Sequence, residues 1–275
     1  MANTEIKLKS TACGAEKGES TFEITVKGKG RAMTQGQTVL CAFYWSDENI
    51  WQGEFAPGEG DTAVIPKGMH LIVDADSVPR LRAVIIQGSL IFLPNKQNPA
   101  HKRTFAADYI FVDGGHLQIG TEQEPYTSKF ELTLHGSPTS ASIPMYGNKV
   151  IAVRFGVIDI HGVDPNPSWQ ELAKTANPGD NSITLNTKNE ISWSVGDRIA
   201  IAPTAFDFKQ TDECAIKSKS KDSEGRPVLG LDCVLKHQHY SGAKKYGSDT
   251  LTMRAEVGLL SRNVVIQGDE SSMEA

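Results

Sequence analysis

Apolar residues in this 275-residue chain gather in short runs that favour β-strands. Each run is rich in valine, isoleucine, leucine or phenylalanine and is bounded by glycine, proline, aspartate or asparagine, the usual pattern of strands separated by turns. The pattern predicts strands over 22–26, 38–44, 63–65, 70–74, 82–86, 89–93, 108–112, 116–119, 130–134, 149–153, 157–161, 182–185, 198–202, 228–231 and 263–267. We therefore expect an all-β protein.

Several of these runs end in the same way, with a polar residue followed by a glycine. The copies are 84–88 (VIIQG), 132–136 (LTLHG), 158–162 (IDIHG) and 264–268 (VVIQG), with a looser copy at 117–120 (LQIG). Repeats that cannot bury a face alone must stack on their neighbours. We therefore predict a right-handed parallel β-helix, preceded by an antiparallel β section, with a β-sandwich as the alternative. Glycines with positive φ would form the corners of the coils, which gives structural roles to Gly88, Gly120, Gly136, Gly162 and Gly268.

One segment has a helical pattern instead. Ser168 and Glu171 have the spacing of a capping box. Apolar residues then recur on one helical face until 177–179 (NPG) ends the pattern. We predict one short helix over 168–176, with Trp169 as a core anchor rather than part of a cofactor site.

The four cysteines are candidates for disulfide bonds. Proximity along the chain pairs Cys13 with Cys41 and Cys214 with Cys233, although four cysteines allow three connectivities. Buried free thiols are the alternative. No CxxC motif or Cys/His cluster occurs, so the spacing does not indicate a zinc site.

Charge and hydropathy narrow the classes of partner. The net charge is -5, and the short basic clusters 96–103 and 217–221 lack interleaved aromatic residues, so we expect no nucleic-acid partner. No run approaches the roughly 20 apolar residues of a membrane span. The first ten residues lack the apolar core of a secretory signal. The chain is then either intracellular or an excerpt whose leader and anchor lie elsewhere.

An ordered series of fragments runs through residues 51–162. Trp51 is followed by 57–61 (PGEGD), 64–68 (VIPKG), 71–74 (LIVD), 81–92, 108–112 (DYIFV), 114–120 (GGHLQIG), 124–126 (EPY) and 132–136 (LTLHG). In this order the fragments resemble the G8 domain, a glycine-rich β module of polycystic-kidney-and-hepatic-disease-type receptors and of cell-migration-inducing, hyaluronan-associated proteins. Further segments are similar to the β-helix that flanks the module in those proteins: 146–149, 158–162, 169–175, 193–199 and 254–264.

The resemblance implies three parts. Residues 1–45 would be an N-terminal β cap or a fragment of a preceding domain, 46–162 the G8-like domain, and 163–275 a continuing β-helix region. About sixteen residues separate the predicted helix from 193–197 (WSVGD), where the hyaluronan-associated proteins usually carry an inserted domain. The chain is therefore more similar to the fibrocystin-like branch.

The resemblance also implies a function and a location. It favours a non-catalytic extracellular module, in a larger surface or secreted protein, that binds carbohydrate or an extracellular matrix or surface protein. The location would be extracellular, or the ectodomain of a membrane protein. A hyaluronan- or polysaccharide-depolymerising glycosidase is the first alternative and a structural spacer is the second.

The residues before the repeat glycines are the candidate ligand-binding set. If the repeats stack, their polar side chains would form a ladder on one side of the solenoid, composed of Gln87, His135, His161 and Gln267. Amides and imidazoles in such a row could hydrogen-bond sugar hydroxyls, and two of the histidines could bind a metal. The alternative is a solvated row, or an internal hydrogen-bonded ladder.

Two smaller groups of residues are candidates for catalysis and for metal binding. Asp74 and Asp76 share one strand face, and Asp159 precedes His161 by two residues, which makes these carboxylates candidates for glycoside cleavage. The alternative is that they cap turns. His237 and His239 have the spacing of a two-histidine metal site without a third ligand. We expect no cofactor, and leave a divalent metal open.

Overall fold

The computed structural model describes residues 5–10, 19–27, 33–40, 42–51, 55–95, 98 and 101–270, and before residue 42 it describes the backbone alone. Over these residues the chain is β-structure apart from two short 3-10 helices, Glu48–Trp51 and Phe208–Gln210. The all-β prediction is therefore confirmed. Among the described residues no helix is long and apolar enough to cross a membrane. The chain forms two compact units, 1–163 with 263–275 and 164–262.

The first unit begins with an antiparallel sheet, as predicted. Its strands are β1 (Glu5–Ser10), β2 (Glu19–Lys27) and β3 (Met33–Leu40), in that spatial order. Both strand pairs are antiparallel.

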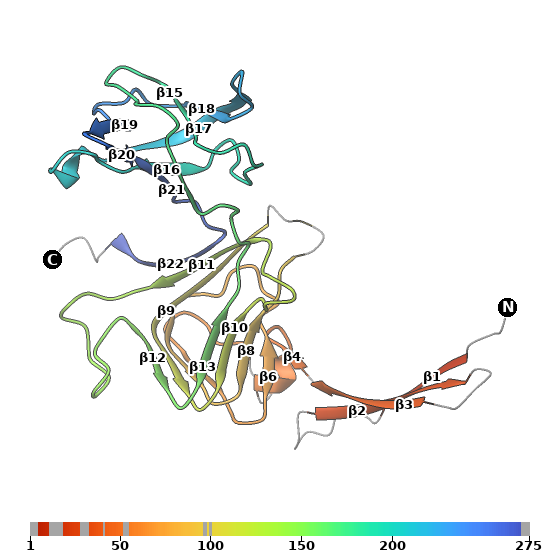
Figure 1. Ribbon diagram of the computed structural model, residues 1–275. Coiled ribbons are helices and arrows are strands. Elements are labelled where there is room, and N and C mark those ends of the chain that lie inside the picture. Colours follow the sequence, from red (N-terminus) through yellow and green to blue (C-terminus); the bar gives the residue numbers. More distant parts are fainter. Residues whose placement is uncertain are drawn as a thin grey trace. The chain divides into compact units, whose positions relative to one another are not determined.

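Two parallel sheets form the rest of this unit (Figure 1). The first, called the β4–β13 sheet, holds β4 (Ala42–Tyr44), β6 (His70–Ile72), β8 (Ser89–Phe92), β10 (His116–Ile119) and β13 (Val157–Ile160). The second, called the β5–β22 sheet, holds β5 (Thr62–Ile65), β7 (Leu81–Ile86), β9 (Lys102–Asp113), β11 (Lys129–Leu134) and β22 (Val264–Gly268), while β12 (Val150–Arg154) also pairs with β9. From β4 to β11 successive strands alternate between the two sheets, so each pass of the chain adds one strand to each.

The inward side chains of both parallel sheets form one apolar core. Side chains alternate along a strand, so Leu71, Leu90 and Leu117 point inward from neighbouring strands of the β4–β13 sheet and are fully buried or nearly so. A row of edge-on aromatic contacts runs through the core, with the pairs Trp45–Trp51, Trp45–Phe105, Phe92–Phe105, Phe92–Phe130 and Tyr126–Phe130. These rings fill space that short aliphatic side chains would leave open.

The glycines that close the sequence repeats do not share one conformation. Gly120 and Gly136 have positive φ angles of 69° and 123°, as a corner glycine should. Gly88 is required for a different reason, because a Cβ there would lie 2.2 Å from a backbone carbonyl oxygen. Gly162 follows β13, whereas Gly268 is the last residue of β22, in the other sheet.

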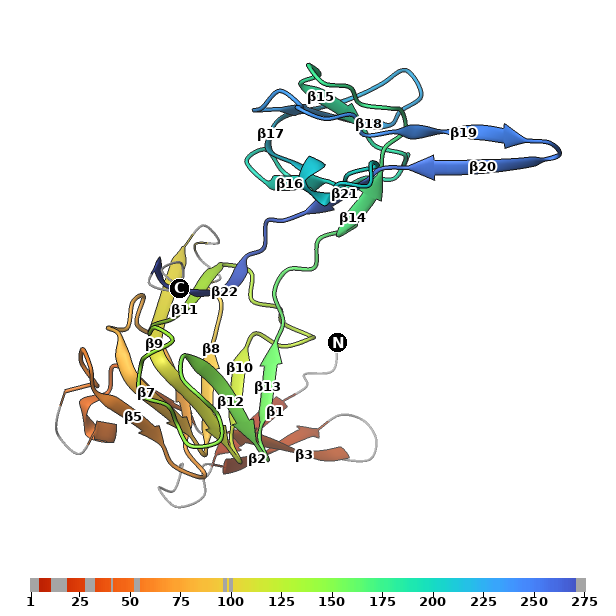
Figure 2. The ribbon, with the colours of Figure 1, turned by 90° about the vertical axis from the view of Figure 1, so that its left-hand side faces the viewer.

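The second unit is built from antiparallel strands. Its sheet has the order β14 (Trp169–Glu171), β21 (Glu256–Leu259), β16 (Arg198–Ile201), β17 (Asp212–Lys221), β18 (Pro227–Leu231), β15 (Ser182–Thr184). A bridge between Leu172 and Leu185 joins the two edges, so the sheet closes around a core that includes Trp193. The hairpin of β19 (Ser241–Tyr246) and β20 (Asp249–Arg254) extends from this sheet (Figure 2). These antiparallel strands differ from the parallel strands of the β-helix region that was expected over residues 163–275.

The predicted helix over 168–176 is not formed. Trp169–Glu171 is strand β14, and it pairs with β21 across the sheet. Trp169 is 52% exposed, so it is not the expected core anchor, whereas Leu172 and Ala176 from the same apolar pattern are buried. The backbone groups of this segment bond to other strands instead of to each other, because cross-strand pairing outweighs a local helical preference of this size.

Candidate functional site

The four residues of the predicted polar ladder do not form one row. Gln267 lies in β22, and Gln87 and His135 directly follow β7 and β11 of the same β5–β22 sheet, whereas His161 follows β13 in the other sheet. Within the β5–β22 sheet, the residue before Gln87 pairs with Val112 and the residue before His135 pairs with Ala107. These partners are five residues apart along β9, which separates Gln87 from His135. The ladder therefore divides into two surfaces.

His135 and Gln267 meet in a groove on the outer face of β9, β11 and β22, which we call the β9–β11–β22 groove. Its volume is ≈ 630 Å³, and its polar lining consists of Thr104, Glu131, Thr133, His135, Gln267, Asp269 and Glu270. Parallel pairing of β11 with β22 sets Thr133 opposite Gln267 and brings together residues from distant parts of the sequence. The groove thus offers amide, hydroxyl, imidazole and carboxylate groups on one surface.

Contacts with carboxylates fix the basic side chains and the histidine of this groove. Nδ1 of His135 lies 3.0 Å from Oδ2 of Asp269, and Nζ of Lys149 donates to Oδ1 of the same carboxylate. Nζ of Lys102 lies 2.7 Å from Oε2 of Glu131. The His135, Asp269 and Lys149 side chains are all less than a quarter exposed, so their positions are constrained.

Asp159 lies apart from the other two candidate carboxylates, Asp74 and Asp76. Asp74 accepts hydrogen bonds from the backbone N–H and the hydroxyl of Ser46, as a turn cap does. Asp76 lies 3.0 Å from His101. Asp159 is in β13, three strands away from β6 in the β4–β13 sheet, which places it at least about 14 Å from Asp74, just after β6, at the usual spacing of about 4.8 Å per strand.

Asp159 lies between two imidazoles on the outer face of the β4–β13 sheet. Its Oδ1 is 2.5 Å from Nε2 of His161, and its Oδ2 is 3.8 Å from Nε2 of His116. Gln87 lines a shallow hollow of ≈ 390 Å³ that Asp159 and His116 also line. Sequence reasoning missed His116, because only the register of β10 against β13 brings it to Asp159.

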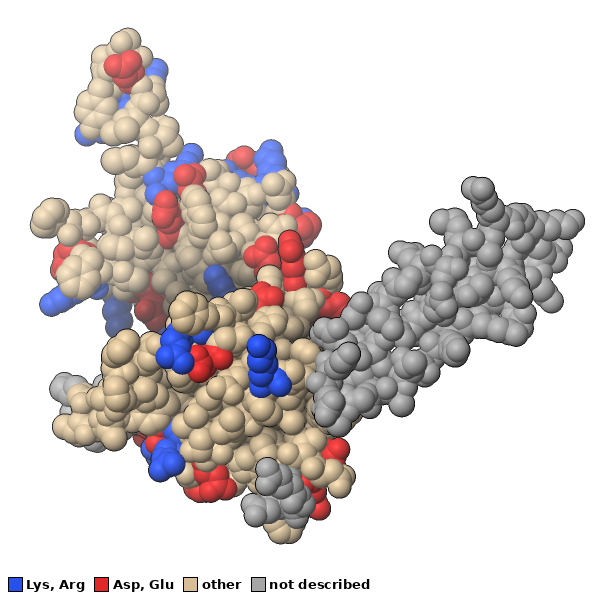
Figure 3. All heavy atoms as spheres, turned by 90° about the horizontal axis from the view of Figure 1, so that it is seen from below, with Lys and Arg blue, Asp and Glu red and all other residues tan. Residues whose placement is uncertain are grey.

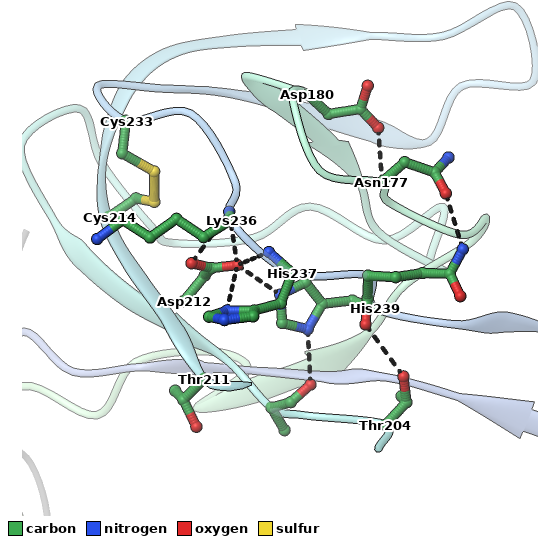
Figure 4. A network of polar contacts seen from close by, with 12 residues as sticks. Asn177, Asp180, Thr204, Thr211, Asp212, Cys214, Cys233, Lys236, His237 and His239 are labelled. Carbon is green, nitrogen blue, oxygen red and sulfur yellow. Dashed lines mark hydrogen bonds and ion pairs between the residues drawn. A yellow bond between two sulfur atoms is a disulfide. The ribbon is translucent and has the colours of Figure 1, made fainter. Parts of the chain in front are cut away.

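In the second unit, the pair His237 and His239 acquires a third partner, Asp212 (Figure 4). Nε2 of His239 lies 3.0 Å and Nδ1 of His237 lies 3.5 Å from Oδ2 of Asp212, which also accepts backbone N–H groups of Lys236 and His237. Nδ1 of the fully buried His239 is 2.9 Å from the carbonyl oxygen of Ala202. Both ring nitrogens of His239 are therefore next to oxygen acceptors, and the network joins the start of β17 to two loops.

The electrostatics of Asp212 follow from this network. Burial alone raises the pKa of its carboxyl group. Hydrogen bonds from His239 and from the backbone of His237 and Lys236 outweigh burial, and hold that pKa below its usual value. Asp212 is separated by more than twenty residues from both histidines, so no local spacing in the sequence indicates it.

Cys214 and Cys233 form a disulfide bond with a Cα–Cα distance of 5.6 Å, as their proximity predicts. Asp232 lies beside the two sulfur atoms, but the sulfurs are bonded to each other and are not free thiolates for a metal. Cys13 and Cys41 lie outside the described residues, so their pairing stays a prediction.

Charges of both signs are interspersed on the molecular face in Figure 3. In the basic cluster 217–221, two lysines take part in local contacts. Lys221 pairs with Glu190, and Nζ of Lys219 donates to the carbonyl oxygens of Ile191 and Trp193.

Comparison with known proteins shows which family and which relatives the chain is similar to. Residues 50–173 match the family model of the G8 domain. Human fibrocystin-L is 35% identical over 250 residues, which cover 90% of this chain and 6% of the relative. Dog fibrocystin is 29% identical over 270 residues, covering 97% of this chain and 6% of the relative. Protein rliB of Dictyostelium discoideum is 30% identical over 244 residues, covering 83% of this chain and 20% of the relative.

The chain therefore contains a G8 domain within an all-β framework. More particularly, it is related to fibrocystin-L and fibrocystin, as the order of fragments in residues 51–162 implied. The chain spans about 6% of the length of these relatives.

Proposed function

We propose that this chain is a non-catalytic binding module of an extracellular or cell-surface protein, and that the β9–β11–β22 groove binds carbohydrate. One observation carries the proposal: His135 and Gln267 both line that groove, although they are more than 130 residues apart in the sequence. Thr104 and Thr133 add hydroxyl groups to the same lining. Side chains of these types donate to and accept from the hydroxyl groups of a sugar.

The shape of the surface supports this function. Repeated parallel pairing lets the chain present polar side chains in rows about 4.8 Å apart. The strands of the first unit alternate between two sheets, and parallel crossover connections are right-handed in nearly all proteins. We therefore propose that this unit is a right-handed β-helix. A rigid solenoid face suits an extended polymer, because side chains fixed on strands lose little entropy on binding.

The non-catalytic part of the proposal rests on the candidate carboxylates. Glycosidases that use two carboxyl groups hold them about 5 to 9.5 Å apart. The register places Asp74 and Asp159 farther apart than this range, and each is engaged by its own local partner. We infer that these residues have structural roles or roles in binding rather than in glycoside cleavage.

The extracellular location is supported by the disulfide bond between Cys214 and Cys233. Disulfide bonds persist in oxidising compartments and are rare where thiols are kept reduced. The similarity to fibrocystin-L is compatible with a module of a larger protein, because the chain spans about 6% of that relative.

A glycan array probed with this chain, alongside a panel of matrix proteins, tests the proposal. We expect binding to at least one class of glycan and no shortening of the bound polymer, including hyaluronan. Binding to a matrix protein without any glycan signal would contradict the carbohydrate assignment. Shortening of hyaluronan that Asp159→Asn abolishes would contradict the non-catalytic assignment.

A further inference from the structure

A cavity on the outer face of β5, β7 and β9 shares no lining residue with the β9–β11–β22 groove or with the hollow beside Asp159. Its volume is ≈ 360 Å³, and sites for small molecules are usually about 300–1,000 Å³. Most of its wall is apolar, and two polar side chains, Thr62 and Arg82, also line it. The wall includes Ala83, Ile85, Tyr109, Phe111 and Ile143.

The register of β7 against β9 builds this apolar wall. Ala83 lies opposite Tyr109, and Ile85 lies opposite Phe111. The residues between them on each strand are fully buried in the core, so these four side chains point outward. Outward side chains of a sheet are usually polar where they face water. Here two neighbouring strands instead offer a surface that an apolar group can cover.

The segment between β11 and β12 closes one side of the cavity. The hydroxyl of Tyr109 donates to the carbonyl oxygen of Ala141, and the rings of Phe111 and Tyr146 lie with their centroids 5.1 Å apart. The N–H of Ile143 donates to the carbonyl oxygen of Gly147 in a turn of this segment. These contacts tie the segment to β9 and keep Ile143 at the cavity.

Arg82 brings a positive charge to this apolar surface. Its guanidinium has one hydrogen bond to the part of the chain that the structure describes, a long one of 3.4 Å from Nη2 to Oγ1 of Thr62. The nearby Arg80, in contrast, is paired with the carboxylate of Asp108 at 2.6 Å. A guanidinium has five N–H donors in a planar fork that fits a carboxylate, so Arg82 has donors left for an anionic group.

We propose that this cavity binds a small organic monocarboxylate with an apolar body. The carboxylate accepts N–H groups of Arg82, and the apolar body covers the wall formed by β7 and β9. Both parts are required, because an exposed ion pair alone contributes little and an apolar wall alone does not distinguish an acid from an alcohol. The charge of Arg82 therefore selects the acid, and the apolar wall supplies most of the buried area.

Calorimetric titration of the whole chain with octanoate tests this site. We expect octanoate to bind at one site, and octanol and octylamine, which have the same chain without the negative charge, to bind at least about tenfold more weakly. Arg82→Gln should weaken octanoate binding by about tenfold and remove the preference over octanol. The matched control is Arg198→Gln, which removes the same charge from an exposed position of the second unit and should bind octanoate like the wild type.

Two further measurements keep the test decisive. Ala83→Leu keeps the charge of Arg82 but fills the cavity, so it should also weaken octanoate binding, and circular dichroism checks that each variant is folded. Amide chemical shifts should change on β7 and β9 around residues 83–85 and 109–111. Absence of octanoate binding to the folded wild type would overturn the site, and so would equal affinity for octanol. Unchanged affinity in Arg82→Gln or in Ala83→Leu, or shifts confined to the β9–β11–β22 groove, would also overturn it.

Discussion

His239 and Asp212 form a buried contact in which Nε2 of the imidazole lies 3.0 Å from Oδ2 of the carboxylate, and neither side chain is more than 7% exposed. The same carboxylate accepts backbone N–H groups of Lys236 and His237, and His239 is also next to the carbonyl oxygen of Ala202. One acidic residue at the start of β17 therefore joins two loops of the second unit.

Asp212→Asn should destabilise the second unit by about 3 kcal/mol, because it removes the charge that faces a buried imidazole. Urea unfolding measures the loss, and hydrogen exchange of the β16 and β17 amides locates it. The control is Asp249→Asn, at an exposed position on β20, which should change stability by less than about 0.5 kcal/mol. Equal effects of the two substitutions would contradict a specific role for Asp212.

The stability of the second unit should fall in acid. The pKa of Asp212 is lowered in the folded state, so its carboxylate contributes stability at a pH above the usual aspartate value of 3.8. That contribution is lost as the pH falls from this value through the lower, folded pKa. Hydrogen exchange of the same amides between pH 6 and about pH 3 should show a steeper loss for the wild type than for Asp212→Asn. Parallel pH profiles would exclude Asp212 as the source.

The Cys214–Cys233 bond closes a segment with a sequence separation of 19. Replacing both cysteines with serine should lower the free energy of unfolding by about 3 kcal/mol, because the unfolded chain regains the entropy that the crosslink removes. Peptide mapping without reductant should recover the two cysteines in one crosslinked fragment. Alkylation of Cys214 in the unreduced, denatured wild type would contradict the bond.

Gly88→Ala should destabilise the first unit by about 3 kcal/mol. A Cβ at this corner would lie 2.2 Å and 2.4 Å from the carbonyl oxygens of Met69 and Pro66, which are backbone atoms and cannot rotate away. Gly58→Ala is the control, because the nearest atom to its Cβ is a carboxylate oxygen at 3.6 Å. Thermal unfolding compares the two variants, and a similar melting temperature for both would show that the corner tolerates a side chain.

Local patterns in the sequence predicted the strands and the disulfide bond because both depend on neighbouring residues. The repeat VIIQG at 84–88 correctly indicated a buried strand ending at a tight corner. The prediction of a helix at 168–176 was wrong. A capping box and an apolar face stabilise this segment less than its pairing with β21 and β15 does.

The candidate surfaces were only partly predictable, because register over long distances is not encoded in short motifs. His135 and Gln267 meet because β22 returns to pair with β11 after the whole second unit. Gln87 and His135 separate because the 12-residue strand β9 pairs with β7 along one part of its length and with β11 along another. The pairing of Asp212 with His239 depends in the same way on the three-dimensional path of the chain.

The central claim is that the β9–β11–β22 groove binds carbohydrate, and matched groove variants test it most directly. Binding to the best array glycan should weaken about fivefold to tenfold in His135→Ala and in Gln267→Ala, since each removes hydrogen bonds worth about 1 kcal/mol. Gln118→Ala, on β10 in the other sheet, is the control and should bind like the wild type. Unchanged affinity in both groove variants, or equal loss in Gln118→Ala, would contradict the claim.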